Sequence, residues 1–305
     1  MEPALNTPSS DRDEMERKFD STWTIARKKF FKRKLAVISL LFLLFIITLS
    51  FLAPYITSED ISRIDMANIN QEPSNEHWFG TDRNGRDVFT RTLYGGRVSL
   101  TIGLTSMLFV TFIGSIIGSI AGFFGGRIDD LFMRFTDFVL TLPFYVFVIV
   151  LNAIMIGFGK VTGMWSLIIV FSLLGWGSVA RIVRSKILAE KENEYVLAAT
   201  SIGSKPSKVI MKHLIPNVMT TIIVQATLLL ATYIVAEAGL SFIGVGVPPE
   251  IPSWGNMLME ARQTDVLQNK LWIWIPPAVC ITLTILSINF FGEGLKDAFD
   301  PKRKK

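Results

Sequence analysis

The chain has 305 residues, of which half are hydrophobic and only 19% are charged, and its formal net charge is +5. A soluble globular domain carries nearer a quarter charged residues, so this composition indicates a bilayer as the solvent for most of the surface. The basic residues stand in short clusters between long uncharged stretches, with no aromatic base-stacking motif, which excludes a nucleic-acid partner. Cys280 is alone and the two histidines are far apart, so we expect neither a disulfide framework nor a metal site.

The N-terminal segment, residues 1–34, is expected to lie in the cytosol. Residues 1–20 mix charges of both signs with Pro and Ser, which predicts a mobile tail. Residues 23–34 predict a basic helix along the inner membrane surface. The first apolar stretch begins only at Leu35 and is followed by others, so it is interpreted as a retained anchor and not as a cleaved signal peptide.

Residues 35–305 are expected to form one transmembrane domain with six spans. A membrane helix needs roughly 20 apolar residues, and six uncharged stretches meet that length. They are 35–58, 98–126, 138–159, 161–180, 214–236 and 271–292. The third and fourth are separated only by Lys160 and are predicted to form a tight hairpin. Pro143, Pro276 and Pro277 are tolerable where neighbouring helices or water satisfy the freed backbone groups.

The orientation follows from the distribution of Lys and Arg. These residues are most frequent in the segments before the first span, between the fourth and fifth spans, and after the sixth. Both termini and the loop 181–217 are therefore predicted to be cytoplasmic. The segments 56–97 and 247–270 become outer loops.

The first outer loop contains charges at helical spacing. Arg83 and Asp87, and then Asp87 and Arg91, are four residues apart, and Gly95-Gly96 is expected to end this helix before the second span. The simplest interpretation is an interfacial helix held by local ion pairs. The alternative is that the segment lines an outer vestibule or meets a partner there.

The second span contains Gly114, Gly118 and Gly122 at four-residue spacing. Small residues on one face let two helix backbones approach closely in a bilayer. The stripe predicts either packing within the chain or an interface with a second membrane subunit.

Glu237 follows the fifth span and is expected at its outer boundary. It lies 19 residues after Val218, and a rise of 1.5 Å per residue places it roughly 29 Å away. The Gly- and Pro-rich stretch that follows indicates a folded outer loop. We hypothesise that Glu237 and this loop form part of an outer gate or vestibule. The alternative is an interfacial Glu that contacts headgroup water.

The loop 181–217 is predicted to contain two short helices. Leu188, Tyr195, Ala198, Ala199 and Ile202 recur near helical spacing, and Gly203 breaks the run. The segment Ser204-Lys205-Pro206-Ser207 then turns the chain toward a second helix near Lys208. Ala198 and Ala199 are expected to form a small-residue ridge suited to a groove on another protein, although an inert connecting loop has the same pattern.

This loop carries a family resemblance. Residues 194–217 read EYVLAATSIGSKPSKVIMKHLIPN, which resembles the EAA loop of ABC importer permeases. Ala198-Ala199, Gly203 and Pro216 match that pattern at the right spacing. Leu197 stands where the loop's Glu would be, which leaves any salt bridge of that Glu in doubt.

The departures from the general pattern resemble one branch, the dipeptide, oligopeptide and nickel permeases. In that branch Glu-Tyr-Val precedes the Ala pair and His-x-x-Pro-Asn closes the loop, as with His213 here. Residues 77–100, HWFGTDRNGRDVFTRTLYGGRVSL, resemble the branch's signature before the second span. Residues 237–258, EAGLSFIGVGVPPEIPSWGNML, resemble its signature after the fifth.

The resemblance implies an all-α polytopic fold of the type I ABC importer permease, with six transmembrane helices. It implies a transport subunit with no catalytic site and no cofactor of its own, while ATP and Mg²⁺ are bound by two P-loop ATPase subunits. The other implied partners are a second homologous permease, an extracellular or periplasmic substrate-binding protein, and the lipid bilayer of a bacterial or archaeal cytoplasmic membrane. The chain itself contains no GxxxxGK[ST] phosphate loop.

Two groups of site residues follow from these arguments. The residues expected to couple the chain to an ATPase are Glu194, Tyr195, Ala198, Ala199, Gly203 and Pro216. The residues assigned to an outer gate or vestibule are Glu237, Asp82, Arg86, Asp87 and Trp254.

The substrate is expected to be a dipeptide or oligopeptide, with nickel or another small solute as the alternative within the branch. An ion-driven secondary transporter would need a charged midplane site between broken helices, and the spans carry almost no ionisable residues. The sequence contains no HExxH, GxSxG or paired intramembrane aspartate motif that would support a membrane-embedded enzyme. Asn152, Gln225 and Asn289 are uncharged polar residues of the spans that either touch solute or bridge helices.

Overall fold

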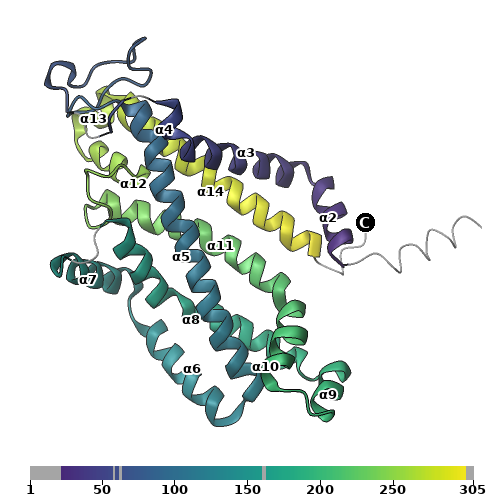
Figure 1. The fold of residues 1–305 in the computed structure, drawn as a ribbon. Helices are drawn as coiled ribbons and strands as arrows, with labels where there is room; N and C mark the ends of the chain where they lie inside the picture. The colour runs from purple at the N-terminus through teal and green to yellow at the C-terminus, as the bar shows by residue number, and fades with distance from the viewer. Residues whose placement is uncertain (1–21, 58, 62–63, 160–162, 300–305) are drawn as a thin grey trace, which may run out of the picture.

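Long helices dominate the structure, a computed structural model that describes residues 22–57, 59–61, 64–159 and 163–299 (Figure 1). Within these ranges no β-strand occurs. The longer helices are α2 (Thr22–Lys32), α3 (Lys34–Phe51), α5 (Val88–Phe124), α6 (Gly126–Thr141), α7 (Phe144–Gly157), α8 (Met164–Glu190), α9 (Glu194–Ser201), α11 (Ile215–Phe242) and α14 (Leu271–Phe299). The shorter ones are α4 (Ala53–Ile56), α10 (Pro206–Val209), α12 (Trp254–Leu258) and α13 (Thr264–Asn269), with single turns at Met66–Asn68, Ile210–Leu214 and Met259–Arg262. The predictions for residues 1–20 and for the turn at Lys160 fall outside the described residues.

Five of these helices are long and apolar enough to cross a bilayer, and the bent pair α6 and α7 supplies a sixth span if it is counted as one. Their outward surfaces are apolar: Leu35, Leu41 and Phe45 on α3 are each about 60% exposed. Large apolar side chains at this density are compatible with lipid and costly in water. The all-α, multi-pass architecture is therefore confirmed.

The third span, predicted over 138–159, is not one continuous helix. α6 and α7 meet at an angle of 86° across the break at Leu142 and Pro143. Leu142 is extended, with φ −69° and ψ 131°, because the ring of a following proline disfavours helical backbone. Arg127 and Arg134, which precede the predicted span, also belong to α6.

The second span also begins earlier than predicted. Asp87 caps α5 by accepting a 2.7 Å hydrogen bond from Thr90 N, and the helix then runs through Gly95 and Gly96 without interruption. The prediction that this pair ends a helix was wrong. The two glycines instead admit Trp254, since a Cβ on Gly96 would lie 2.7 Å from its ring.

α5 illustrates why several helix boundaries lie beyond the apolar stretches. Its 37 residues give a length of about 55 Å, against a hydrocarbon core of roughly 30 Å. α8, α11 and α14 likewise run past the ends predicted for their spans. These helices are therefore longer than the uncharged stretches from which their spans were predicted.

The glycine stripe of α5 packs within the chain, against α8. Cβ atoms on Gly114, Gly118 and Gly122 would each lie within 3 Å of atoms of α8, the closest being 2.4 Å between Gly118 and the carbonyl oxygen of Ala180. Of the two interpretations of the stripe, intrachain packing is the one this geometry supports. Close backbone approach replaces the hydrophobic drive that a bilayer does not supply between helices.

Replacing Gly118 with Ala is expected to lower the free energy of unfolding by about 1–3 kcal/mol, because the new methyl group overpacks the contact with α8. Gly239 of α11 is the matched control, since a Cβ there meets no atom within 4 Å. Gly239→Ala should be neutral or stabilise by up to about 1 kcal/mol through helix propensity. Thermal unfolding midpoints of the two purified variants check this, and equal midpoints would contradict it.

The predicted basic helix exists as α2 and packs on the end of α14. The rings of Phe30 and Phe291 are 5.6 Å apart in an edge-to-face arrangement, and Arg33 forms an ion pair with Asp297. Its position at the membrane surface stays a prediction.

Candidate functional site

The predicted site residues lie at opposite ends of the bundle (Figure 1). We call the end that carries α9 and α10 the loop end, and the end that carries α12 and α13 the network end. The loop end holds the residues expected to meet an ATPase. The network end holds those assigned to an outer gate.

The two helices predicted in the loop 181–217 are present, with different limits. α8 extends to Glu190, so Leu188 belongs to the span and not to α9. α10 begins at Pro206 and continues through the single turn at Ile210–Leu214 directly into α11. Any movement of α10 is therefore transmitted to a membrane-spanning helix.

Gly203 makes the turn between α9 and α10. Its φ is +80°, which L-residues with a Cβ resist, although a Cβ at this position would meet no atom within 4 Å. Ser204 N donates to the carbonyl oxygen of Ala199 over 3.2 Å, which closes the end of α9. The prediction that Gly203 breaks the helical run is confirmed.

The predicted ridge of Ala198 and Ala199 is wrong. Ala199 is buried with Val196 and Val209 in the core of the bundle, whereas Ala198 is exposed. Neighbouring residues on a helix point about 100° apart, so two consecutive alanines do not share one face. Ala199 and its two neighbours instead hold the loop against the rest of the chain.

Four large apolar side chains are exposed on the same loop and on the turn that follows it. Tyr195, Leu197, Ile202 and Met211, which we call the loop face, are 39%, 54%, 83% and 67% exposed. They stand among the polar residues at the end of the bundle, where lysines such as Lys205 and Lys212 are also exposed. Exposed apolar clusters with a polar rim are typical of protein interaction sites.

Polar contacts hold Tyr195 in place. Its hydroxyl donates to the carboxylate of Glu190 and accepts a 2.7 Å hydrogen bond from Asn217 Nδ2. Tyr195 thereby links α9 to the ends of α8 and α11. Glu194 lies in the first turn of α9, where a carboxylate complements the helix dipole, and Pro216 lies at the exposed start of α11.

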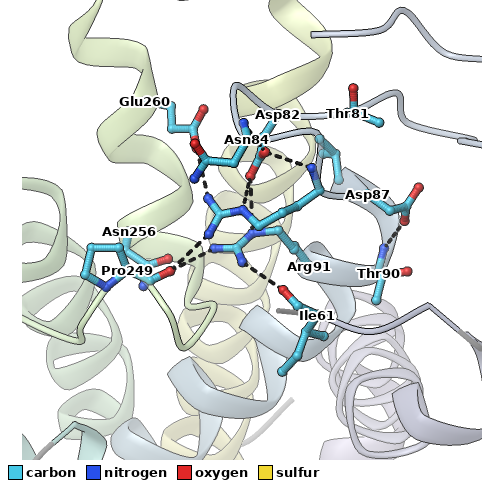
Figure 2. Close-up of polar contacts among 12 residues, drawn as sticks. Ile61, Thr81, Asp82, Asn84, Asp87, Thr90, Arg91, Pro249, Asn256 and Glu260 are labelled. Carbon is cyan, nitrogen blue, oxygen red and sulfur yellow. Dashed lines mark hydrogen bonds and ion pairs between the residues drawn. The ribbon is translucent and has the colours of Figure 1, made fainter. Parts of the chain in front are cut away.

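At the network end, Asp82 is the centre of a buried ionic cluster (Figure 2). Its carboxylate accepts hydrogen bonds from Asn84 N at 2.8 Å, from Arg86 N at 3.0 Å and from Arg86 Nε at 2.7 Å. Arg91 Nε lies 3.6 Å away, and the side chains of Asp82 and Arg91 are each only 4% exposed. The carboxylate therefore contacts both guanidinium groups and offsets part of their charge.

The same two arginines reach three separate parts of the chain. Arg91 donates to the carbonyl oxygens of Pro249 and Ile61, at 3.2 and 3.4 Å. Arg86 lies 3.5 Å from Glu260 Oε1. The cluster thus fastens the segment before α5 to the start of α5 and to the loop between α11 and α14.

Arg91 and Glu260 were not among the predicted site residues. Arg91 was assigned to an ion pair with Asp87, but Asp87 caps α5 and lies 3.0 Å from His77 Nδ1. Asp is a common capping residue, and this signal could have placed the start of α5 at Asp87 and Arg91 just after its first turn. Nothing local in the sequence connects Glu260 to Asp82.

Burial raises the pKa of Glu260, and the nearby Asp82 carboxylate raises it further, while the arginines partly offset both effects. A carboxyl group with a raised pKa in the folded state stabilises the fold most below its unfolded pKa. This contribution is lost as pH rises through the folded pKa. We therefore expect the stability of Glu260→Gln to fall less than that of the wild type as pH rises from about 4.5 towards neutrality. Unfolding midpoints across this pH range check this, and parallel profiles would contradict it.

Glu237 and Trp254 form a second cluster at the network end. Ser99 Oγ and Ser241 Oγ each donate to the Glu237 carboxylate over 2.7 Å. The same hydroxyls accept from Trp254 N and Val247 N, at 3.2 and 3.0 Å. Glu237 therefore holds the loop 247–254 against α5 through two serines.

Glu237 is fully buried, so the interpretation as an interfacial Glu in contact with headgroup water is wrong. The indole of Trp254 is also fully buried, and its Nε1 donates to the carbonyl oxygen of Thr92 over 2.9 Å. In the same region, Asn152 of α7 donates a 2.8 Å hydrogen bond to the carbonyl oxygen of Val245, and so joins α7 to the loop after α11. The structure thus brings Asp82 and Arg86 together in one cluster and Glu237 and Trp254 in another, with Asp87 beside the first. Their role in a gate stays a prediction.

An apolar helical bundle with buried polar clusters at one end and a projecting helical loop at the other defines a multi-pass membrane protein. The chain belongs to the family of binding-protein-dependent transport system inner membrane components, whose model matches residues 114–305. A second family model, the N-terminal transmembrane domain of oligopeptide transport permease C, matches residues 21–73. The resemblance to dipeptide and oligopeptide permeases is thereby confirmed.

Individual relatives match along almost the whole chain. An oligopeptide transport system permease protein of Bacillus subtilis is 38% identical over 304 residues, which cover 100% of this chain and 97% of the relative. A dipeptide transport system permease protein of the same species is 40% identical over 280 residues, covering 92% and 86%. A putative peptide permease protein of Brucella suis is 41% identical over 288 residues, covering 92% of each.

Proposed function

We propose that this chain is one permease subunit of an ATP-driven importer for peptides. It forms half of a translocation pathway with a second, related permease, and ATP hydrolysis takes place on partner ATPase subunits. The names of the relatives support a peptide substrate. The observation that carries the mechanism is the loop face, an exposed apolar surface on a segment that is continuous with a membrane-spanning helix.

The loop face is the proposed docking surface for an ATPase. Leu197 and Ile202 point away from the bundle, while Val196 and Ala199 anchor the same helix to it. Because the inner side of α9 is fixed to the bundle, a force applied to its outer side is transmitted to the bundle and does not merely deform the loop. Because α10 runs into α11, displacement of the docked loop moves a wall of the bundle.

This assignment places the loop end in the cytosol and the network end outside. The abundance of Lys and Arg around the loop 181–217 supports that orientation. The network end then faces an external binding protein that delivers the peptide. The clusters around Asp82 and Glu237 keep the outer segments in one arrangement for that contact.

The test is purification of the tagged chain from its native membranes in mild detergent, followed by identification of the associated proteins. Recovery of a second multi-pass permease and P-loop ATPases, with ATP-dependent peptide uptake after reconstitution of the complex in proteoliposomes, is the expected result. Recovery of the chain alone or as a homo-oligomer, with no ATPase, would overturn the proposal.

A further inference from the structure

An apolar groove of about 450 Å³ lies between α2, α3, α11 and α14. It is lined by Phe30 and Phe31 of α2, by Phe291 and Leu295 of α14, and by Leu40 of α3. Phe31 is 59% exposed, so the groove opens to the outside of the bundle. Because Leu40 lies six residues after the start of α3, the groove reaches about 9 Å along that span.

Arg27 is the only charged side chain among the described residues that line this groove. It is exposed, and it makes no ion pair with any residue in the described ranges. It also begins a strongly basic stretch, since six of the eight residues 27–34 are Lys or Arg. Arg33 of this stretch is already paired with Asp297 of α14. The groove thus combines an apolar lining with one exposed positive charge.

The groove lies where the chain changes from basic to apolar. Lys34 ends the basic stretch, and on α3 the apolar Leu35 and Ile38 are 63% and 61% exposed. α3 runs from α2 to the network end, which places α2 on the same side of the bilayer as the loop end (Figure 1). A helix with basic residues at such a change lies at the boundary between lipid headgroups and acyl chains.

We propose that this groove binds an anionic phospholipid, with an acyl chain against the phenylalanines and the phosphate on Arg27. A guanidinium group binds phosphate through paired, charge-assisted hydrogen bonds. Clusters of four to eight basic residues beside a membrane span are typical of binding to anionic lipids. The bound lipid adds contacts between α2 and α14 and therefore stabilises their packing. The site requires only the bilayer, so it goes beyond the proposed transport function and does not depend on it.

Size and charge favour this lipid over other occupants. One turn of a helix with its side chains, 10–12 Å across and 5.4 Å long, fills about 500 Å³, so a helix of another subunit does not fit along the groove. A zwitterionic phospholipid brings a cationic group next to the basic stretch. A soluble phosphate pairs with Arg27 but leaves the phenylalanines uncovered. An anionic phospholipid matches both the apolar lining and the charge.

The experiment measures lipid binding to the full chain, purified in an uncharged detergent, through the rise in its unfolding midpoint with added lipid. Phosphatidylglycerol is compared with phosphatidylcholine and with sn-glycerol 3-phosphate, which carries a phosphate but no acyl chain. The variant is Arg27→Gln. Lys34→Gln is the matched control, because Lys34 belongs to the same basic stretch and is exposed but does not line the groove.

Phosphatidylglycerol should raise the midpoint of the wild type, and the two other compounds should not. Arg27→Gln should bind phosphatidylglycerol about fivefold to tenfold more weakly, whereas Lys34→Gln should stay within about twofold of the wild type. Without lipid, both variants should unfold at the wild-type midpoint, because both side chains are exposed. A photo-reactive residue at position 31 in an otherwise unchanged chain should cross-link to phosphatidylglycerol.

Four outcomes would overturn the proposal. Equal weakening in Arg27→Gln and Lys34→Gln would show a general attraction to the basic stretch and no site at the groove. Equal binding of phosphatidylcholine would remove the role of the charge, and equal stabilisation by sn-glycerol 3-phosphate would show a site for soluble phosphate. Cross-links from position 31 to protein alone would assign the groove to another subunit or another segment of this chain. Recovery of an ATPase bears on none of these, so the proposed function is tested separately.

Discussion

Replacing Leu197 with Glu is expected to weaken binding of the proposed ATPase partner at least about 30-fold and to stop ATP-dependent transport. Leu197 is 54% exposed and lies in the middle of α9, so the change leaves the buried side of the helix untouched. Large apolar residues at the centre of an interface commonly contribute about 2 kcal/mol or more, and a carboxylate in their place must also be desolvated. The measurements are the affinity of the purified ATPase for the reconstituted permease and the rate of ATP-dependent uptake.

Met66→Glu is the matched control for this prediction. Met66 is also a large exposed apolar residue, but it lies at the network end, far along the chain from the loop. It should leave ATPase affinity unchanged. Wild-type affinity in Leu197→Glu, with the permease folded, would rule out docking through the loop face. Ala199→Trp is a poor substitute as a test, because Ala199 packs inward and its replacement disturbs the loop itself.

Replacing Asp82 with Ala is expected to lower the free energy of unfolding by about 3–5 kcal/mol, because it leaves Arg86 and Arg91 buried beside each other with only Glu260 to balance them. The variant also loses the carboxylate that organises the turn before α5, since two backbone amides donate to it. We expect a lower unfolding midpoint and faster hydrogen exchange of the amides around residues 80–87. Transport should fall with them, because the segments at the network end lose their common anchor.

The control for Asp82 is Asp265, which pairs with Lys270 at 2.5 Å on the surface, with the Asp265 side chain 59% exposed. Exposed ion pairs of this kind contribute little, so Asp265→Ala should leave the unfolding midpoint nearly unchanged. If both variants behaved alike, the cluster around Asp82 would have no special structural role.

Several features of the site could be predicted because they depend on local chemistry. The turn at Gly203 followed from a glycine that ends a helical pattern, and its φ of +80° confirms the reason. The two helices of the loop followed from apolar spacing and Pro206. The close helix packing at Gly118 followed from the four-residue spacing of the glycines, although the sequence left open which helix would pack there.

Features that depend on contacts between distant segments could not be predicted. Counting helical rise placed Glu237 at the end of a span, but it did not reveal that residues 247–254 fold back over it and that Ser99 of another helix reaches it. Ala199 was expected on an exposed ridge because its burial depends on core residues from other segments, among them Val209 beyond the turn. Pro143 was noted in the sequence as a proline within a span. Because the residues on both sides of it are apolar, they gave no sign of the bend between α6 and α7.

The sequence by itself determined the class of protein, the family, the number of apolar stretches and the helical character of the loop, because hydrophobicity, helix length and turn residues act over a few neighbouring positions. Only the tertiary structure decided which face of α9 is free, which charges share the cluster around Asp82, and which residue of the basic stretch 27–34 lines a groove. The physical reason is that burial and hydrogen-bond pairing are properties of surfaces in contact. Ser99 and Glu237 are 138 positions apart in the chain but share one hydrogen bond.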